Sequence, residues 1–237
     1  MGRRDQFKTN NNPAELTIEW AGDRDDGFFY FYDKEAKQKV KLSDLRFAVL
    51  GERHGITGYS QDMKTGLYSN EVGSTENQTI TVKYYKDGKS HELVSGKYKD
   101  IKEVARAKGG KFTSFVYALV LDCNEIDTGT IVKILMSGAC TSPWIDFKKS
   151  GGAENGVELN GYTDASNGGI KFRAPVFAKT ELDETEDSEA EDAYGIVATY
   201  FKNAPHTTHQ EDTDSPSDYY TDADIPAEDE DEDDFPF

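Results

Sequence analysis

The sequence predicts a mainly β domain built around one principal helix and followed by a disordered acidic C-terminal tail. Three observations lead to this fold class. Short apolar segments, separated by polar or glycine-containing stretches, recur through the first 180 residues. One segment among them, near residues 98–106, changes to the helical period. Beyond residue 180, acidic residues replace most of the apolar ones.

The first half of the chain is predicted to form mainly β-strands. Residues 1–14 are polar and predict a flexible N-terminal arm, and the domain is expected over residues 15–180. Strand-like segments lie at 16–20, 28–32, 39–42 and 47–50. The glycine-punctuated stretch 51–73 predicts long loops or an extended hairpin. Asp87-Gly88, between the alternating segments 78–85 and 90–94, is a strong hairpin signal.

The principal helix comes next. Tyr98, Ile101, Val104 and Ala105 share one helical face, and Gly109-Gly110 is expected to end the helix. Strands at 112–121 and 130–136, a short helix at 143–148 and a last strand at 170–178 follow. Several strands, one helix and further strands is the element order of an OB-type barrel. A β-sandwich with one crossing helix would give a similar order.

Two segments are expected after the domain. Residues 181–202 form an acidic connector in which Ala190, Tyr194, Val197 and Phe201 recur at the spacing of a short amphipathic helix. Residues 203–237 contain few aliphatic side chains, so they bury too little apolar surface to offset the entropy of ordering. They predict a disordered tail.

The charge is unevenly distributed. The net charge is −18, but residues 203–237 hold 13 acids and no Lys or Arg, whereas residues 1–179 hold 24 acids and 26 bases. A near-neutral body can gather its bases against a polyanion. The N-terminus lacks an apolar signal core and no apolar stretch could span a membrane, so we expect a cytoplasmic protein. Cys123 and Cys140 lie in apolar stretches and are expected to be reduced.

The sequence offers no enzyme motif. The stretch before Gly88-Lys89-Ser90 lacks the earlier glycine of a P-loop, since Lys83 stands in its place. There is no His-Glu-x-x-His and no Gly-x-Ser-x-Gly. We therefore expect no catalysis, no cofactor and no metal site.

Aromatic and cationic residues alternate along the body, as expected for a protein that stacks bases and contacts phosphates of single-stranded DNA. Strand alternation places Tyr30 and Tyr32 on one face and Phe29 and Phe31 on the other. The alternative is that these aromatics are core residues. The candidate DNA-binding residues are Trp20, Tyr30, Tyr32, Lys39, Lys41, Arg53, Tyr59, Tyr68, Lys83 and Tyr85.

The C-terminal tip combines an acidic run with an aromatic end. Asp233 and Asp234 lead directly into Phe235-Pro236-Phe237. An aromatic tip on a disordered acidic arm is suited to an apolar pocket with a basic rim on a partner protein.

The ending Asp-Asp-Phe-Pro-Phe resembles the tip of bacterial single-stranded DNA-binding proteins, and the overall plan resembles bacteriophage-encoded members of that group. The segments 58–72, 96–117 and 131–147 are similar to those of tailed-phage members. The resemblance implies an OB-fold domain that protects single-stranded DNA during phage replication, recombination or repair in the host cytoplasm. The tetramer of the bacterial proteins is not carried over, and a monomer or a dimer is expected. It implies that the tip recruits replication or recombination proteins and that the tail modulates DNA binding. An acidic DNA mimic that inhibits basic partners is the alternative function.

Overall fold

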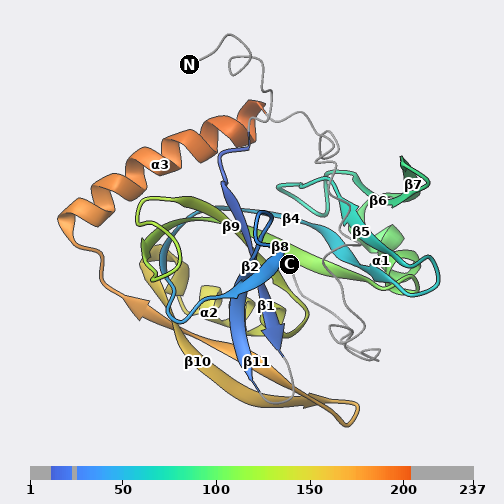
Figure 1. Cartoon of the computed structure of the whole chain (residues 1–237). Coiled ribbons are helices and arrows are strands. Elements are labelled where there is room, and N and C mark those ends of the chain that lie inside the picture. The colour runs from blue at the N-terminus through green and yellow to red at the C-terminus, as the bar shows by residue number, and fades with distance from the viewer. Residues whose placement is uncertain (1–11, 23–25, 204–237) are drawn as a thin grey trace.

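The computed structural model describes residues 12–22 and 26–203, and this part of the chain is mainly β (Figure 1). Residues 1–11 of the predicted arm and residues 204–237 of the predicted tail lie outside the described residues. The described strands are β1 Leu16–Gly22, β2 Gly27–Asp33, β3 Gln38–Lys41, β4 Arg46–Ser60, β5 Thr65–Ser69, β6 Ile80–Lys86, β7 Lys89–Gly96, β8 Gly110–Asp122, β9 Ile131–Ser137, β10 Gly156–Asn167 and β11 Ile170–Thr180.

All of these strands belong to one mixed sheet. Its order is β3-β2-β1-β9-β8-β4-β5-β6-β7, with β10 paired to β4 and β11 paired to β10. The pair β1–β9 is parallel and the other pairs are antiparallel. Strand β4 is long enough to pair with β8 along most of its length, with β10 at its start and with β5 at its end. The two long strands β4 and β8 therefore connect both sides of the molecule.

The hairpin signals are confirmed. The stretch expected to be loops or an extended hairpin is the second half of β4 turning into β5. Strands β6 and β7 pair across a turn in which Asp87 and Gly88 have φ of 52° and 73°. Both values lie in the left-handed region that a two-residue hairpin turn requires, and aspartate and glycine tolerate it best.

Helix α1, Tyr98–Arg106, covers one side of the β5–β7 part of the sheet. Tyr98, Ile101 and Ala105 pack against Leu67, Ile80 and Val82 of the strands, as the periodicity predicted. Val104 was expected on the same face but is 48% exposed. Successive helical residues are about 100° apart around the axis. Because Ala105 lies on the narrow buried stripe, Val104 points away from it toward solvent.

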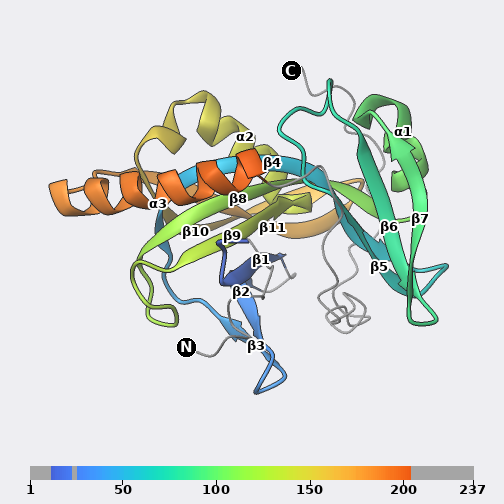
Figure 2. The same ribbon diagram turned by 90° about the horizontal axis from the view of Figure 1, so that it is seen from above.

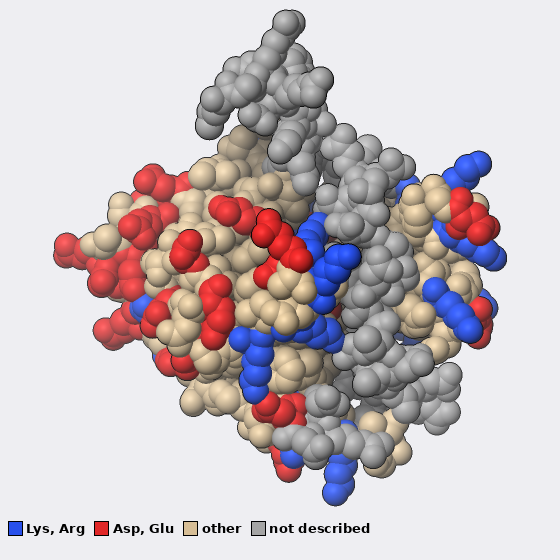
Figure 3. Space-filling view, viewed as in Figure 1, with Lys and Arg blue, Asp and Glu red and all other residues tan. Residues whose placement is uncertain are grey.

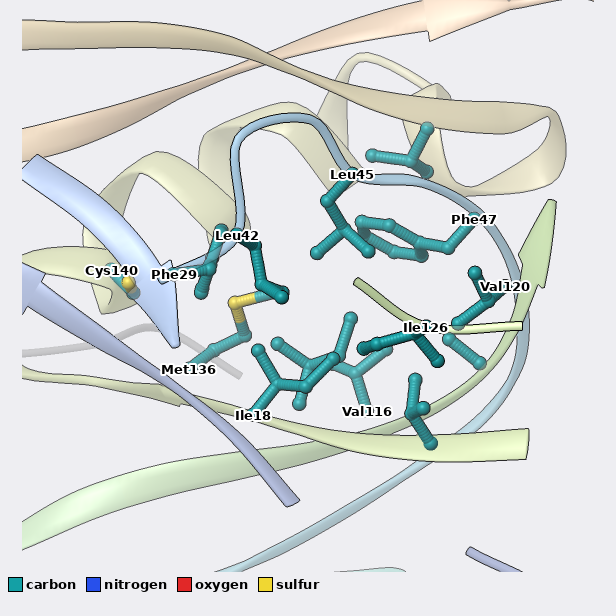
Figure 4. Close-up of a cluster of buried hydrophobic side chains, with 14 of the residues drawn as sticks. Ile18, Phe29, Leu42, Leu45, Phe47, Val116, Val120, Ile126, Met136 and Cys140 are labelled. Atoms are coloured by element: carbon teal, nitrogen blue, oxygen red, sulfur yellow. The ribbon is translucent and has the colours of Figure 1, made fainter. Parts of the chain in front are cut away.

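Helix α2, Thr141–Lys149, covers the same side of the sheet at its other end (Figure 2). Its Trp144 is fully buried in the main hydrophobic cluster. Figure 4 shows Ile18 of β1, Phe47 of β4 and Met136 of β9 pointing into this cluster. Cys140 is also buried there, Cys123 is half-buried, and both thiols are free, as predicted.

Helix α3, Glu184–Asn203, replaces the predicted connector and short helix by one continuous helix. Asp183 caps it, since its carboxylate accepts hydrogen bonds from the backbone N–H groups of Thr185 and Glu186. The helix packs against β4 and β8 through Ala193 and Val197. Tyr194 was expected on this buried stripe but is 56% exposed, because the stripe runs through the preceding residue.

The predicted mainly β class is confirmed, but the hydrogen-bonded sheet does not close, so the OB-type barrel is not confirmed. Strand β11 returns to lie against β1 and β2, where the Trp20 indole Nε1 donates a hydrogen bond to the Arg173 carbonyl at 3.0 Å. No backbone pairing between β11 and β2 is found among the described residues. Strand β11 therefore meets β1 and β2 through contacts that involve side chains.

Candidate nucleic-acid interface

The predicted DNA-binding residues of the N-terminal strands share one face of the sheet. In β2, Tyr30 and Tyr32 alternate with Phe29 and Phe31. Tyr30 is paired in register with Lys41 of β3, and Tyr32 with Lys39. Directly opposite residues of neighbouring strands point to the same side, so these four side chains form one surface. Phe29, on the other side, is fully buried in the main hydrophobic cluster.

The predicted residues of β5 and β6 form a second group. Tyr68 is paired in register with Lys83, and Tyr85 lies two residues further along β6 on the same side. Tyr59 of β4 pairs with Gly66, which lies on that side of β5. Leu67, Ile80 and Val82 point the other way, into the cluster under α1.

Both groups lie on the same face of the continuous sheet, because a row of registered pairs connects them. Glu19 of β1 pairs with Tyr30 on one side and with Leu135 of β9 on the other. Leu135 pairs with Phe115 of β8, which pairs with Arg53 of β4. We call this surface the aromatic-cationic face, and it consists of Tyr30, Tyr32, Lys39, Lys41, Arg53, Tyr59, Tyr68, Lys83 and Tyr85.

The two groups stand at opposite sides of a bend in the sheet. Figure 2 shows β1–β3 and β5–β7 on either side of the long strands, while α2 and α1 lie on the other side of the sheet. Five strand-to-strand steps separate β2 from β5, which is roughly 24 Å along the sheet at about 4.8 Å per step. A ligand that touches both groups must therefore be long.

Polar residues lie between the groups, and sequence reasoning did not find them. The hydroxyls of Thr57 and Thr113 are 2.7 Å apart on this face. Lys133 pairs with Glu71 at 3.1 Å, and the Tyr117 hydroxyl donates to the same carboxylate at 2.9 Å. Burial, together with the charge of Glu71, raises the pKa of Tyr117, which keeps this hydroxyl a donor. The Lys133 side chain is only 7% exposed, and its charge is paired with Glu71 instead of facing a ligand.

The cations of the N-terminal group lie against aromatic rings. The Lys39 ammonium is 4.5 Å from the centroid of the Tyr30 ring, and the Lys41 ammonium is 4.6 Å from that of Phe28. Lys41 also pairs with Asp26. The Tyr30 hydroxyl donates to Glu19 at 3.0 Å, which fixes the ring. Tyr30 is only 8% exposed, so its ring lies largely within the protein, beneath the Lys39 ammonium.

The second group makes a different set of contacts. Lys83 makes no ion pair with another residue of the part of the chain that the structure describes. The Tyr68 hydroxyl lies 2.7 Å from that of Ser90, and the Tyr85 hydroxyl donates to the Gly88 carbonyl at 2.8 Å. Both hydrogen bonds involve the tyrosine hydroxyl and not the face of the aromatic ring.

Arg53 lies between the two groups, against the end of α3. Its guanidinium donates to the Phe201 carbonyl at 3.1 Å and lies 4.2 Å from the centroid of the Phe201 ring. A phosphate oxygen and a stacked base would make the same two kinds of contact with a guanidinium. No local pattern indicates this contact, because it joins residues 148 positions apart.

Trp20 is the one predicted DNA-binding residue that lies on the opposite side of β1. It pairs in register with Phe29, and their ring centroids are 5.0 Å apart. Its ring packs against the main hydrophobic cluster. The structure therefore places Trp20 with the core and with β11, away from the aromatic-cationic face.

Charge is also unevenly distributed over the surface. Figure 3 shows Asp and Glu side chains gathered at the left, where α3 lies in Figure 1, and Lys and Arg side chains in the middle and at the right. The predicted partner-binding residues Asp233, Asp234, Phe235, Pro236 and Phe237 lie outside the described residues.

The part of the chain that the structure describes contains neither a metal-binding cluster nor a membrane-spanning helix. Within residues 12–22 and 26–203, no three His, Cys, Asp or Glu side chains are grouped so that they could hold a metal ion. No helix in that same part of the chain is long and apolar enough to cross a membrane. Comparisons with protein-family models, with curated proteins and with solved structures give no match.

Proposed function

We propose that this protein binds single-stranded DNA through the aromatic-cationic face, with little sequence preference. One observation carries the proposal: nine of the ten residues chosen for alternating aromatic and cationic character lie on one face, although they come from five strands. The phenylalanine and aliphatic neighbours with which they alternate point to the other side and form the core.

The chemistry of the face suits a single strand better than a duplex. Tyrosine rings offer stacking surfaces, which only unpaired bases can use, and lysine and arginine contact phosphates. None of these groups is arranged to read one base, so the binding is sequence-independent. The OB-type description belongs to this proposal, and it is supported by the return of β11 to β1 and β2 around one hydrophobic cluster.

Titration of fluorescent oligothymidine, and of a duplex of equal length, at low and moderate salt tests the proposal. We expect tight binding of the single strand, weaker binding of the duplex, and a loss of affinity as salt rises. Lys83→Ala should flatten the salt dependence by roughly one unit per lost phosphate contact. Lys149→Ala, which removes an exposed cation on α2, is the matched control. Equal effects of the two variants would overturn the assignment of the face.

The acidic segment from residue 203 has two proposed roles. Its 13 acids, tethered to the domain, compete with DNA for the cations, so truncation after Lys202 should tighten DNA binding most at low salt. The tip Phe235-Pro236-Phe237 recruits replication or recombination proteins in the cytoplasm of the host cell. Deleting Phe237 should abolish capture of those proteins. The competition between the acidic segment and DNA should remain, because it needs only charge. An unchanged set of captured proteins would exclude the second role.

If the protein binds no single-stranded DNA but binds basic proteins, the alternative function, an acidic DNA mimic, holds instead. The bacteriophage assignment and the absence of enzymatic activity are parts of the same proposal.

A further inference from the structure

We propose that the last turn of α3 occupies a nucleotide-binding subsite on the aromatic-cationic face and that single-stranded DNA displaces it. The subsite is the space over Gly51 beside Arg53, and its ligand is an unpaired base with its phosphate. This inference rests on the proposed function for the identity of that ligand. Figure 2 shows the C-terminal end of α3 over the long strands β4 and β8, at the middle of the molecule.

The Phe201 ring fills the place that a base would take. A Cβ on Gly51 would lie 2.7 Å from this ring, so the glycine leaves room for a flat group at this point of β4. The Arg53 guanidinium lies 4.2 Å from the ring centroid. The Tyr117 ring meets the Phe201 ring edge to face, with centroids 5.1 Å apart. A flat ring here lies against a cation and an aromatic side chain, as a stacked base does in a single-strand site.

The backbone of the same turn takes the place of the phosphate. Helix α3 ends at Asn203, so the Phe201 carbonyl is one of the last four, which have no partner within the helix. The helix dipole adds partial negative charge at this end. The Arg53 guanidinium donates to the carbonyl at 3.1 Å. The turn therefore offers Arg53 an aromatic ring and a partly negative oxygen, the two kinds of group that a nucleotide brings.

The Arg53 guanidinium is positioned by the loop that follows β5. A Cβ on Gly73 would lie 2.3 Å from Arg53 Nη1, so the glycine lets the guanidinium lie close to the backbone of this loop. The loop is tied to β4 by two backbone hydrogen bonds of 2.8 Å between His54 and Val72. Arg53 makes no ion pair with another residue of the ranges 12–22 and 26–203. No carboxylate of that part of the chain competes with a phosphate for it.

The rest of α3 has its own attachments, so the last turn can leave alone. Val197 is fully buried and Ala193 is nearly so. At the start of the helix, Asp183 caps the backbone and Arg46 pairs with Glu186. Residues 198–203 are half-buried or exposed. Helix ends with few buried contacts open at low free energy, so DNA displaces this turn without undocking the helix.

Hydrogen exchange of the full wild-type chain tests the displacement without any substitution. The backbone amides of residues 200–203 are followed with and without saturating oligothymidine of about 25 nucleotides. We expect their exchange to become about tenfold faster in the complex, because the displaced turn loses its helical hydrogen bonds. The amides of Ala193 and Val197 should keep their rates and serve as the internal control. Unchanged or slower exchange at residues 200–203 would overturn the displacement.

A double-mutant cycle tests whether Arg53 is the group that the turn covers. Phe201→Ala should tighten oligothymidine binding about two- to fivefold in the wild-type background. It should have no effect in the Arg53→Gln background, where no cation is left to uncover. Tyr194→Ala, on the exposed side of α3, should change neither. Equal tightening in both backgrounds would mean that the turn obstructs DNA elsewhere, and would overturn the subsite at Arg53.

A failure of the proposed function gives a different result. The wild-type chain and the Phe201→Ala variant would then both fail to bind oligothymidine, and both proposals would fall together. Binding by the wild-type chain with residues 200–203 still protected would keep the proposed function and overturn this inference alone. Binding that appears only after Phe201→Ala would support both.

Discussion

The two ends of one face of the sheet differ sharply, although the same strands β4 and β8 form both. At one end Ala48, Leu50, Leu119 and Leu121 are aliphatic, and α3 covers them. Toward the other end the same face carries Arg53, Thr57 and Tyr59 on β4, with Lys111 and Thr113 on β8. The helix ends where the aliphatic residues end. The side-chain composition therefore determines where the fold buries this face and where the face is suited to a ligand.

The largest expected effect is on stability at the aliphatic end. Leu119→Ala should lower the free energy of unfolding by about 2–5 kcal/mol, because it leaves a cavity between α3 and β8. Lys83→Ala, at the other end, should stay within about 0.5 kcal/mol. Denaturant unfolding of both variants measures the difference. Similar losses would mean that both ends contribute to the core.

A smaller effect, on DNA affinity, is expected at the polar end. Tyr68→Ala should cost about 1–3 kcal/mol of single-strand affinity if a base stacks on this ring. Tyr68→Phe, which keeps the ring and removes the contact with Ser90, should bind almost as the wild type does. Thermal melting checks that both variants fold. A loss in the Phe variant as large as in the Ala variant would assign the effect to the hydroxyl.

The boundary between the two ends is the contact of Arg53 with Phe201. Phe201→Ala removes the ring from the guanidinium and keeps the hydrogen bond to the backbone carbonyl, and we expect DNA binding to tighten by about 0.5–1 kcal/mol because the cation–π contact no longer competes for Arg53. Tyr194→Ala, on the exposed side of the same helix, is the control. Weaker DNA binding by the Phe201 variant would show that the ring supports the site.

The smallest effect is a pH dependence at the far end of α3. The hydrogen bond from Arg46 lowers the pKa of Glu186 below its ordinary value of 4.5. The ionised carboxylate therefore stabilises the folded state above pH 4.5, and this contribution is lost as the pH falls through the lowered pKa. The pair is partly exposed, so we expect at most about 1 kcal/mol. Glu186→Gln should flatten the dependence of stability on pH as the pH falls below 4.5. An unchanged profile would contradict this.

Local patterns in the sequence predicted much of the fold and of the candidate face. Alternation along β2 separated Tyr30 and Tyr32 from Phe29 correctly, because a strand turns successive side chains to opposite sides. Strand β10 was missed, since its second half lies beyond the hydrophobic cluster and has no apolar alternation. The stack of Phe201 on Arg53 and the packing of Trp20 against β11 are contacts between distant segments, which periodicity cannot reveal.

The continuous backbone ladder from β2 to β6 has a consequence for the thermodynamics of binding. Two modules on a flexible linker would sample many separations, whereas here hydrogen-bonded strands hold the two aromatic groups at one separation. The protein is preorganised, so the conformational entropy lost on binding comes mainly from the DNA. A strand too short to reach from Tyr32 to Tyr68 gains the contacts of one group alone, and affinity should rise steeply at the length that first spans both.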